Sequence, residues 1–176
     1  MPLPIAHGLL GASVIAWLHP QPAATRNYRP LLIGALLANA ADLDFLLVFA
    51  LQSKAWHRGF SHSIAFALLV CVIFTVALGK PQLRLAIAYG LAFASHGFLD
   101  YVTSKEGSGV ALLWPFSGER LIFGWWGLSE VPSKLTPLEI LGALTLEFML
   151  FTPLLLGVLL LRKALARRSG SPASAI

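Results

Sequence analysis

The chain has 176 residues, of which 57% are hydrophobic and only 12% are charged, and its mean hydropathy is +0.75. This composition excludes a soluble globular protein, whose surface must carry charge, and several apolar runs of about 17 to 25 residues can each span a bilayer. The net charge of +5 does not indicate a nucleic-acid partner, because the basic residues are scattered over loops or directly follow the last apolar run. We therefore predict a polytopic membrane protein.

The apolar runs predict an all-α bundle of about five transmembrane helices. A segment rich in Gly, Ser, Pro and Trp, residues 103–137, precedes the last run, and we expect it to be an interfacial or re-entrant excursion. One transmembrane domain is expected over residues 1–165, followed by a disordered cytoplasmic tail over residues 166–176. The runs are Leu3–Leu18, Leu31–Leu51, Ile64–Gly79, which begins near Phe60, Leu85–Val102, and Leu138–Leu161.

The basic residues also predict an orientation. The densest basic group, Arg162 to Arg168, directly follows the last apolar run, as is typical of a cytoplasmic anchor on anionic lipid. With this group in the cytoplasm, the cytoplasmic segments carry no acidic residue, whereas the outer segments mix both charges. Five alternating spans then place the N-terminus outside and the C-terminus in the cytoplasm.

A short polar turn separates the second run from the third and reads His-Arg-Gly-Phe-Ser-His-Ser over residues 57–63. Histidines and aspartates of the other runs lie at about the same depth in the membrane as this turn. At a helix rise of about 1.5 Å per residue, Asp42 lies roughly 20 Å above Arg29, and His96 lies roughly 18 Å above Arg84. We therefore expect these polar side chains to meet in the outer half of the bilayer.

Carboxylates at this depth require a positive partner. An isolated aspartate near the membrane centre costs about 2.5–3.5 kcal/mol, neutral histidines cannot neutralise it, and Arg58 can serve only one or two acids. One or two divalent ions would neutralise the acids and use the imidazoles as ligands. Zinc suits this donor set best, and manganese or iron are alternatives.

The spacing of the acids favours the same conclusion. His96 and Asp100 are four residues apart, so they face the same side of one helix. Asp42 and Asp44 are roughly 200° apart on an ideal helix, so one is expected to be a ligand and the other a supporting group or a ligand of a second ion. The candidate metal ligands are His7, Asp42, Asp44, His57, His62, His96 and Asp100, and the candidate catalytic residues are Arg58, Asp44 and Asp100.

These motifs, in this order, resemble a known family. They are the early His7, Ala-Asp-Leu-Asp at 41–44, the turn at 57–63, Ser-His-Gly-Phe-Leu-Asp-Tyr-Val-Thr-Ser at 95–104 and Trp-Pro-Phe-Ser at 114–117. Over residues 4–117 the chain resembles the bacterial membrane-bound, metal-dependent hydrolases, also labelled LexA-binding, inner-membrane-associated hydrolases. That family is remotely similar to the zinc-dependent phospholipase C and fungal zinc nuclease superfamily.

The resemblance implies a catalytic domain in the bacterial inner membrane and a particular ligand set. One ion would be held by Asp42, His57, His96 and Asp100, with Asp100 bridging to a second ion held by His7. No histidine follows His96, so the ligands of that superfamily's third zinc are absent, and two ions are the most that we expect.

We therefore expect an integral membrane metal-dependent hydrolase that cleaves a phosphoester or ester of a lipid or lipid-linked substrate with metal-activated water. Arg58 either holds negative charge on the substrate or extends toward the membrane interface. Two alternatives stay open: a cation transporter or channel that uses the intramembrane His and Asp, and a non-catalytic interaction protein. Glu147, inside the last run, is left open as a base, a hydrogen-bonding partner or a structural group.

Overall fold

The structure is a computed structural model that describes residues 2–19, 27–104, 109–125 and 136–168. These residues are helical apart from turns, extended connections and a single isolated β-bridge between Val110 and Leu121. The all-α prediction is therefore confirmed. The helices are α1 (Pro4–Leu18), α2 (Arg29–Ala40), α3 (Phe45–Leu51), α4 (Ile64–Leu78), α5 (Leu83–Thr103) and α6 (Pro137–Arg168).

Three stretches among the described residues are long and apolar enough to cross a membrane: Arg29–Leu51, Lys80–Thr103 and Pro137–Arg168. A fourth is present if Lys54–His62 and Ile64–Leu78, which meet at a bend of 52°, form one broken span. The fifth predicted run corresponds to α1, which is apolar but has only 15 residues.

Some of the predicted features lie outside the described residues. They include most of the loop after α1, the residues Lys105, Glu106, Trp126, Glu130 and Lys134 of the excursion, and the tail from residue 169 onward. The first three residues of the predicted tail, 166–168, belong to the end of α6.

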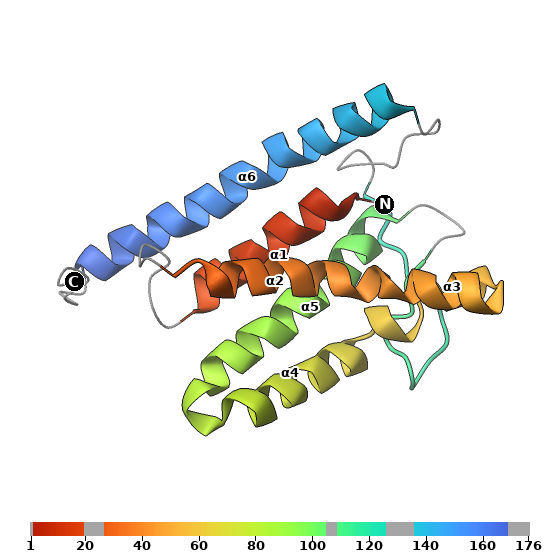
Figure 1. Cartoon of the computed structure of the whole chain (residues 1–176), viewed down its shortest axis with the longest axis horizontal. Coiled ribbons are helices and arrows are strands. Elements are labelled where there is room, and N and C mark those ends of the chain that lie inside the picture. The colour runs from red at the N-terminus through yellow and green to blue at the C-terminus, as the bar shows by residue number, and fades with distance from the viewer. Residues whose placement is uncertain (1, 20–26, 105–108, 126–135, 169–176) are drawn as a thin grey trace.

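The short helix α1 lies at the centre of the bundle and contacts α2, α5 and α6 (Figure 1). Two glycine positions allow close helix packing. A Cβ atom on Gly11 of α1 would lie 2.5 Å from the Cβ atom of Ala38 on α2, and one on Gly90 of α5 would lie 2.6 Å from the Cβ atom of Cys71 on α4. Small residues let helix backbones approach each other in this way inside a membrane. The bundle therefore holds α1, α2, α4 and α5 in close contact.

The second predicted run is not one continuous α-helix. After α2 the chain tightens into a 3-10 turn, Ala41–Asp44, before α3 continues in nearly the same direction (Figure 1). Short 3-10 stretches within a helix often mark functional positions. The two acids of this run, Asp42 and Asp44, both lie in the tightened turn.

The described part of the excursion, residues 109–125, ties the polar turn to the end of α5. It makes backbone hydrogen bonds to both and so links the two segments that carry predicted ligands. The donors and acceptors are Ala111 N to Arg58 O at 3.0 Å, Ile64 N to Leu112 O at 3.0 Å, Phe123 N to Tyr101 O at 3.0 Å and Trp125 N to Val102 O at 2.7 Å.

Candidate metal centre

The predicted ligand residues come together at the end of the bundle where α1 begins and α5 ends (Figure 1). Asp42 Oδ1 lies 3.3 Å from His96 Nε2 and 3.5 Å from His62 Nε2. Asp100 Oδ2 lies 3.7 Å from His62 Nε2, and Asp100 Oδ1 lies 3.6 Å from His7 Nε2. Four helical segments thus supply one continuous cluster.

Within the described residues the ligand atoms form two groups that could each hold an ion. His7, His96 and Asp100 form one, and Asp42, His57 and His62 form the other, each with its atoms within 4.8 Å of one another. The resemblance implies a different division, with His96 and Asp100 beside Asp42 and His57. Because Asp42 Oδ1 approaches both His62 and His96, it links the two groups.

The tautomer of His96 follows from its surroundings. Its Nδ1 lies 2.6 Å from the backbone carbonyl oxygen of Ala38. A carbonyl oxygen only accepts hydrogen bonds, so Nδ1 carries the proton and donates it. In the neutral ring Nε2 then carries a lone pair directed at Asp42. An Nδ1 held in this way by a backbone carbonyl is the usual support of a metal-binding histidine.

Asp44 organises the polar turn with both of its carboxylate oxygens. Oδ1 accepts from His57 Nδ1 at 3.0 Å, and Oδ2 accepts from Arg58 N at 3.0 Å and Ser61 Oγ at 2.9 Å. Because Ser61 gives its only hydrogen to Asp44, it accepts from the Nδ1–H of His62 at 2.9 Å. The neutral rings of His57 and His62 therefore also keep their lone pairs on Nε2. Asp44 thus orients the rings of His57 and His62 from their Nδ1 sides, directly and through Ser61.

The atoms at the centre of the cluster are acceptors that face other acceptors. Within the described residues, Asp42 Oδ1, His62 Nε2 and His96 Nε2 are buried and make no hydrogen bond. Asp42 Oδ1 lies 3.3–3.5 Å from the two Nε2 atoms. The lone pairs on these atoms repel each other unless a cation or a proton lies between them. With neutral histidines, the three aspartates and Arg58 give the cluster a net charge of −2. The donor set and the charge both fit a divalent metal ion.

Arg58 supports Asp100. Its Nε lies 3.0 Å from Asp100 Oδ2 and its Nη1 donates to Ser104 Oγ at 2.9 Å. The side chain is 5% exposed, so in this structure the guanidinium is buried against Asp100 and does not extend to the surface. Arg58 also has a positive φ of 58°, a left-handed conformation that costs a non-glycine residue roughly 1–2 kcal/mol. Such strain is concentrated at functional sites.

Two supporting residues were missed in the sequence. A Cβ atom on Gly97 would overlap the carbonyl oxygen of His62, so the turn packs directly on α5 beside His96. Arg120 donates to Ala55 O at 2.8 Å, His57 O at 3.0 Å and Gly109 O at 3.2 Å. In the sequence, a small residue directly after His96 could have indicated close packing at Gly97. No sequence pattern could have indicated the role of Arg120, because its partners Ala55 and His57 are 65 and 63 residues away along the chain.

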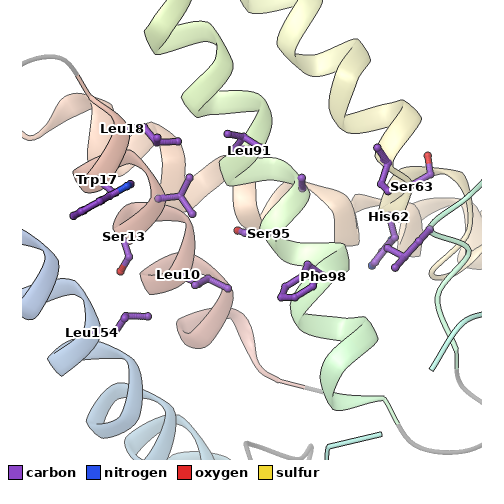
Figure 2. Close-up of a pocket in the computed structure, with 14 residues that line it drawn as sticks. Leu10, Ser13, Trp17, Leu18, His62, Ser63, Leu91, Ser95, Phe98 and Leu154 are labelled. Atoms are coloured by element: carbon purple, nitrogen blue, oxygen red, sulfur yellow. The ribbon is translucent and has the colours of Figure 1, made fainter. Parts of the chain in front are cut away.

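A groove of about 590 Å³ crosses α5 between α1 and the start of α4 (Figure 2). Its walls are apolar, and the hydroxyls of Ser13 and Ser95 donate to carbonyls of their own helices. The groove touches the cluster only at His62, whose side chain is fully buried. The accessible edge of the cluster lies elsewhere, at the side chains of Asp42 and His57, which are 24% and 18% exposed.

Comparison with known proteins agrees with a membrane location. Residues 1–169 match the family described as YdjM inner membrane protein. The chain is also similar to inner membrane protein YbcI of Escherichia coli (strain K12), with 30% identity over 141 residues that cover 77% of this chain and 80% of YbcI. No solved structure matches the chain. The family match covers all of the candidate ligands.

Proposed function

The chain belongs to the YdjM inner membrane protein family, and from the geometry of its buried cluster we propose that it is an integral membrane metal-dependent hydrolase. This proposal rests on one observation. Asp42 Oδ1, His62 Nε2 and His96 Nε2 lie close together, and none of them has a hydrogen-bond partner among the described residues. The proposed ligands are His7, Asp42, His57, His62, His96 and Asp100, for one or two ions.

The mixture of imidazole nitrogen and carboxylate oxygen is the donor set that zinc prefers, with manganese or iron as alternatives. A divalent ion bound here would activate a water molecule and polarise the ester oxygen of a substrate.

The protein's own contribution is to hold the ligands in place. Asp44 and Ser61 fix the rings of His57 and His62, and Arg58 holds Asp100. Such supporting contacts set the orientation and basicity of metal ligands. Asp44 and Arg58, both predicted as catalytic residues, are therefore assigned a supporting role in this proposal.

The surroundings of the accessible edge support an amphiphilic substrate. The ring of Phe45, at the start of α3, lies 4.1 Å from the ring of His57, measured between centroids. Leu43, Phe45 and Leu46 are exposed apolar side chains within the candidate span Arg29–Leu51. The edge at Asp42 and His57 therefore adjoins surface that lipid would cover. A phosphoester or ester of a lipid or lipid-linked compound, entering sideways from the bilayer, fits this position.

The transporter alternative gains no support from the described residues. At the other end of α1 and α5 the buried cluster consists of Ile15, Ala88, Tyr89 and Ala92. An ion pathway through the bundle would need polar side chains along its length, and this cluster offers a single phenol. The alternative of a non-catalytic interaction protein stays a prediction.

Metal analysis of the purified protein tests the proposal. We expect the wild type to retain one or two equivalents of zinc, and His96→Ala to lose them with an unchanged far-UV circular dichroism spectrum. His19→Ala is the matched control, since this histidine follows α1 at the opposite end from His7. The zinc-loaded protein should then hydrolyse phosphoester or lipid ester substrates in a screen, and His96→Ala should not. A wild type as free of metal as His96→Ala would overturn the proposal.

We further propose that the N-terminus lies outside and the C-terminus in the cytoplasm. The basic end of α6, with Arg167 and Arg168 in its last turn, supports this orientation through the positive-inside rule. A reporter that is active only in the cytoplasm should be active when fused after α6. If only a reporter that requires export is active when fused at this position, the orientation is the reverse.

A further inference from the structure

Glu147 is an acid in the first half of α6 that the proposed chemistry does not use. The residue is 0% exposed, although most of this 32-residue helix faces outward and only Glu147 and Phe151 are buried in it. A buried carboxyl group in a membrane-spanning helix is costly unless other groups satisfy it. Its partners therefore indicate why it is there.

Those partners are backbone N–H groups at the start of α1. One carboxyl oxygen of Glu147 accepts from Leu3 N, and the other accepts from Ala6 N at 3.0 Å. The helix cannot satisfy these groups itself, because its N-cap residue is Leu3, which has no side-chain acceptor. First-turn N–H groups lack partners within a helix, and a bilayer offers little water to replace them. Glu147 thus acts as the N-terminal cap of α1 from another helix.

The capped turn leads directly to a proposed metal ligand. His7 follows Ala6 and is 1% exposed, and its ring stacks on that of His96 with a centroid distance of 3.8 Å and an interplanar angle of 17°. A shift of α1 by one residue would move His7 by about 1.5 Å along the helix axis and rotate it by about 100°. The stacking and the contact with Asp100 both depend on the register of α1.

We propose that Glu147 is a positioning residue, which holds the first turn of α1 so that His7 stays in register with His96 and Asp100. This assignment rests on the proposed function, in which His7 is a metal ligand. The hydrogen bonds to α1 explain why the acid is buried. Glu147 acts on His7 through α1 and does not need to contact the metal centre itself.

A double-mutant cycle in the full-length protein tests the assignment, with Zn²⁺ affinity measured by chelator competition. We expect Glu147→Ala to weaken Zn²⁺ binding about tenfold to a hundredfold, the range found for residues that support metal ligands. In a His7→Ala background the same change should have no further effect. A merely structural role would weaken binding equally in both backgrounds, and that result would overturn the proposal. Glu139→Ala, at an exposed position in the first turn of the same helix, should leave the affinity unchanged.

A second measurement decides the question without metal. Glu147→Ala should speed amide hydrogen exchange in the first turn of α1 and raise the reactivity of His7 toward diethylpyrocarbonate, while α4 and α5 exchange as before. Glu147→Gln, which keeps one carbonyl acceptor, should show a smaller effect and serves if the alanine variant does not fold. If neither variant alters exchange or His7 reactivity, the assignment fails. If no form of the protein binds zinc, the proposed hydrolase fails, and the exchange and reactivity results alone decide the role of Glu147.

Discussion

The two halves of α5 use the same packing device for different purposes. Gly90 allows α4 to approach closely at Cys71, and Gly97, seven residues later, allows the polar turn to approach at His62. Around Gly90 the buried side chains are apolar except for the phenol of Tyr89, as in Ala88 and Ala92. Around Gly97 they are the ligands of the proposed metal centre.

The two regions differ in how their polar groups are satisfied. Near the apolar half, Ser13 donates to Leu9 O at 2.7 Å and Thr75 donates to Cys71 O at 2.8 Å, so each hydroxyl is satisfied within its own helix. In the cluster half, Asp42 Oδ1 is buried and receives no hydrogen bond from the described residues. The polar groups of the first region are satisfied within their own helices, whereas those of the second would be satisfied by the cation of the proposed function. Fold and metal binding should therefore respond to different substitutions.

The largest effect is expected within the cluster itself, where Asp42 and Asp44 can be compared. Asp42→Asn should weaken Zn²⁺ binding by more than about a hundredfold, because it removes the negative charge of a proposed ligand. Asp44→Asn should weaken it about tenfold to a hundredfold, because Asp44 supports His57 and His62. Chelator competition measures both. The reverse order would make Asp44 the direct ligand.

Alanine at the two glycines of α5 tests whether the two regions are independent. Gly97→Ala should force the turn at His62 away from α5 and reduce Zn²⁺ affinity about tenfold. Gly90→Ala should instead lower thermal stability in detergent, since overpacking costs about 1–3 kcal/mol, and leave the affinity of the folded protein unchanged. Gly157→Ala, where an added Cβ meets nothing within 4 Å, is the control. Equal effects of the first two variants on affinity would show that the two regions are coupled.

The smallest effect is expected from Arg120, which holds the turn from outside. Arg120→Gln should weaken Zn²⁺ binding about threefold to tenfold, because a net hydrogen bond contributes about 0.5–1.5 kcal/mol and the guanidinium donates to three carbonyls. Lys54→Gln, an exposed change just before the same turn, should have no effect. If the two variants match, the contacts of Arg120 do not stabilise the turn.

Much of the fold could be predicted because the lengths of apolar runs report directly on membrane spans. The break in the second run could not, since Ala41–Asp44 are compatible with a continuous helix and the 3-10 turn depends on contacts with the polar turn. Asp42 and Asp44 were expected to point in different directions, and in the structure Asp42 faces His96 while Asp44 faces His57. Both also approach His62, at its opposite ring nitrogens.

The meeting of these histidines and aspartates in one cluster was predictable for a different reason. Histidine and aspartate are costly in a membrane, so each is conspicuous in the sequence and its depth can be counted. The supporting groups are not conspicuous. The carbonyl of Ala38 that orients His96 belongs to a residue 58 positions away, and any residue type could supply it. The division into two ligand groups also depends on helix packing, which the spacing along the chain does not encode.

The ring of Phe45 beside His57 has a consequence for how rates would have to be measured. Under the proposed function, a substrate reaches His57 past this aromatic side chain after it has dissolved among the lipids. Turnover by such a hydrolase would follow the mole fraction of substrate within the micelle or vesicle. Adding inert detergent at constant bulk concentration of substrate would then slow the reaction by surface dilution.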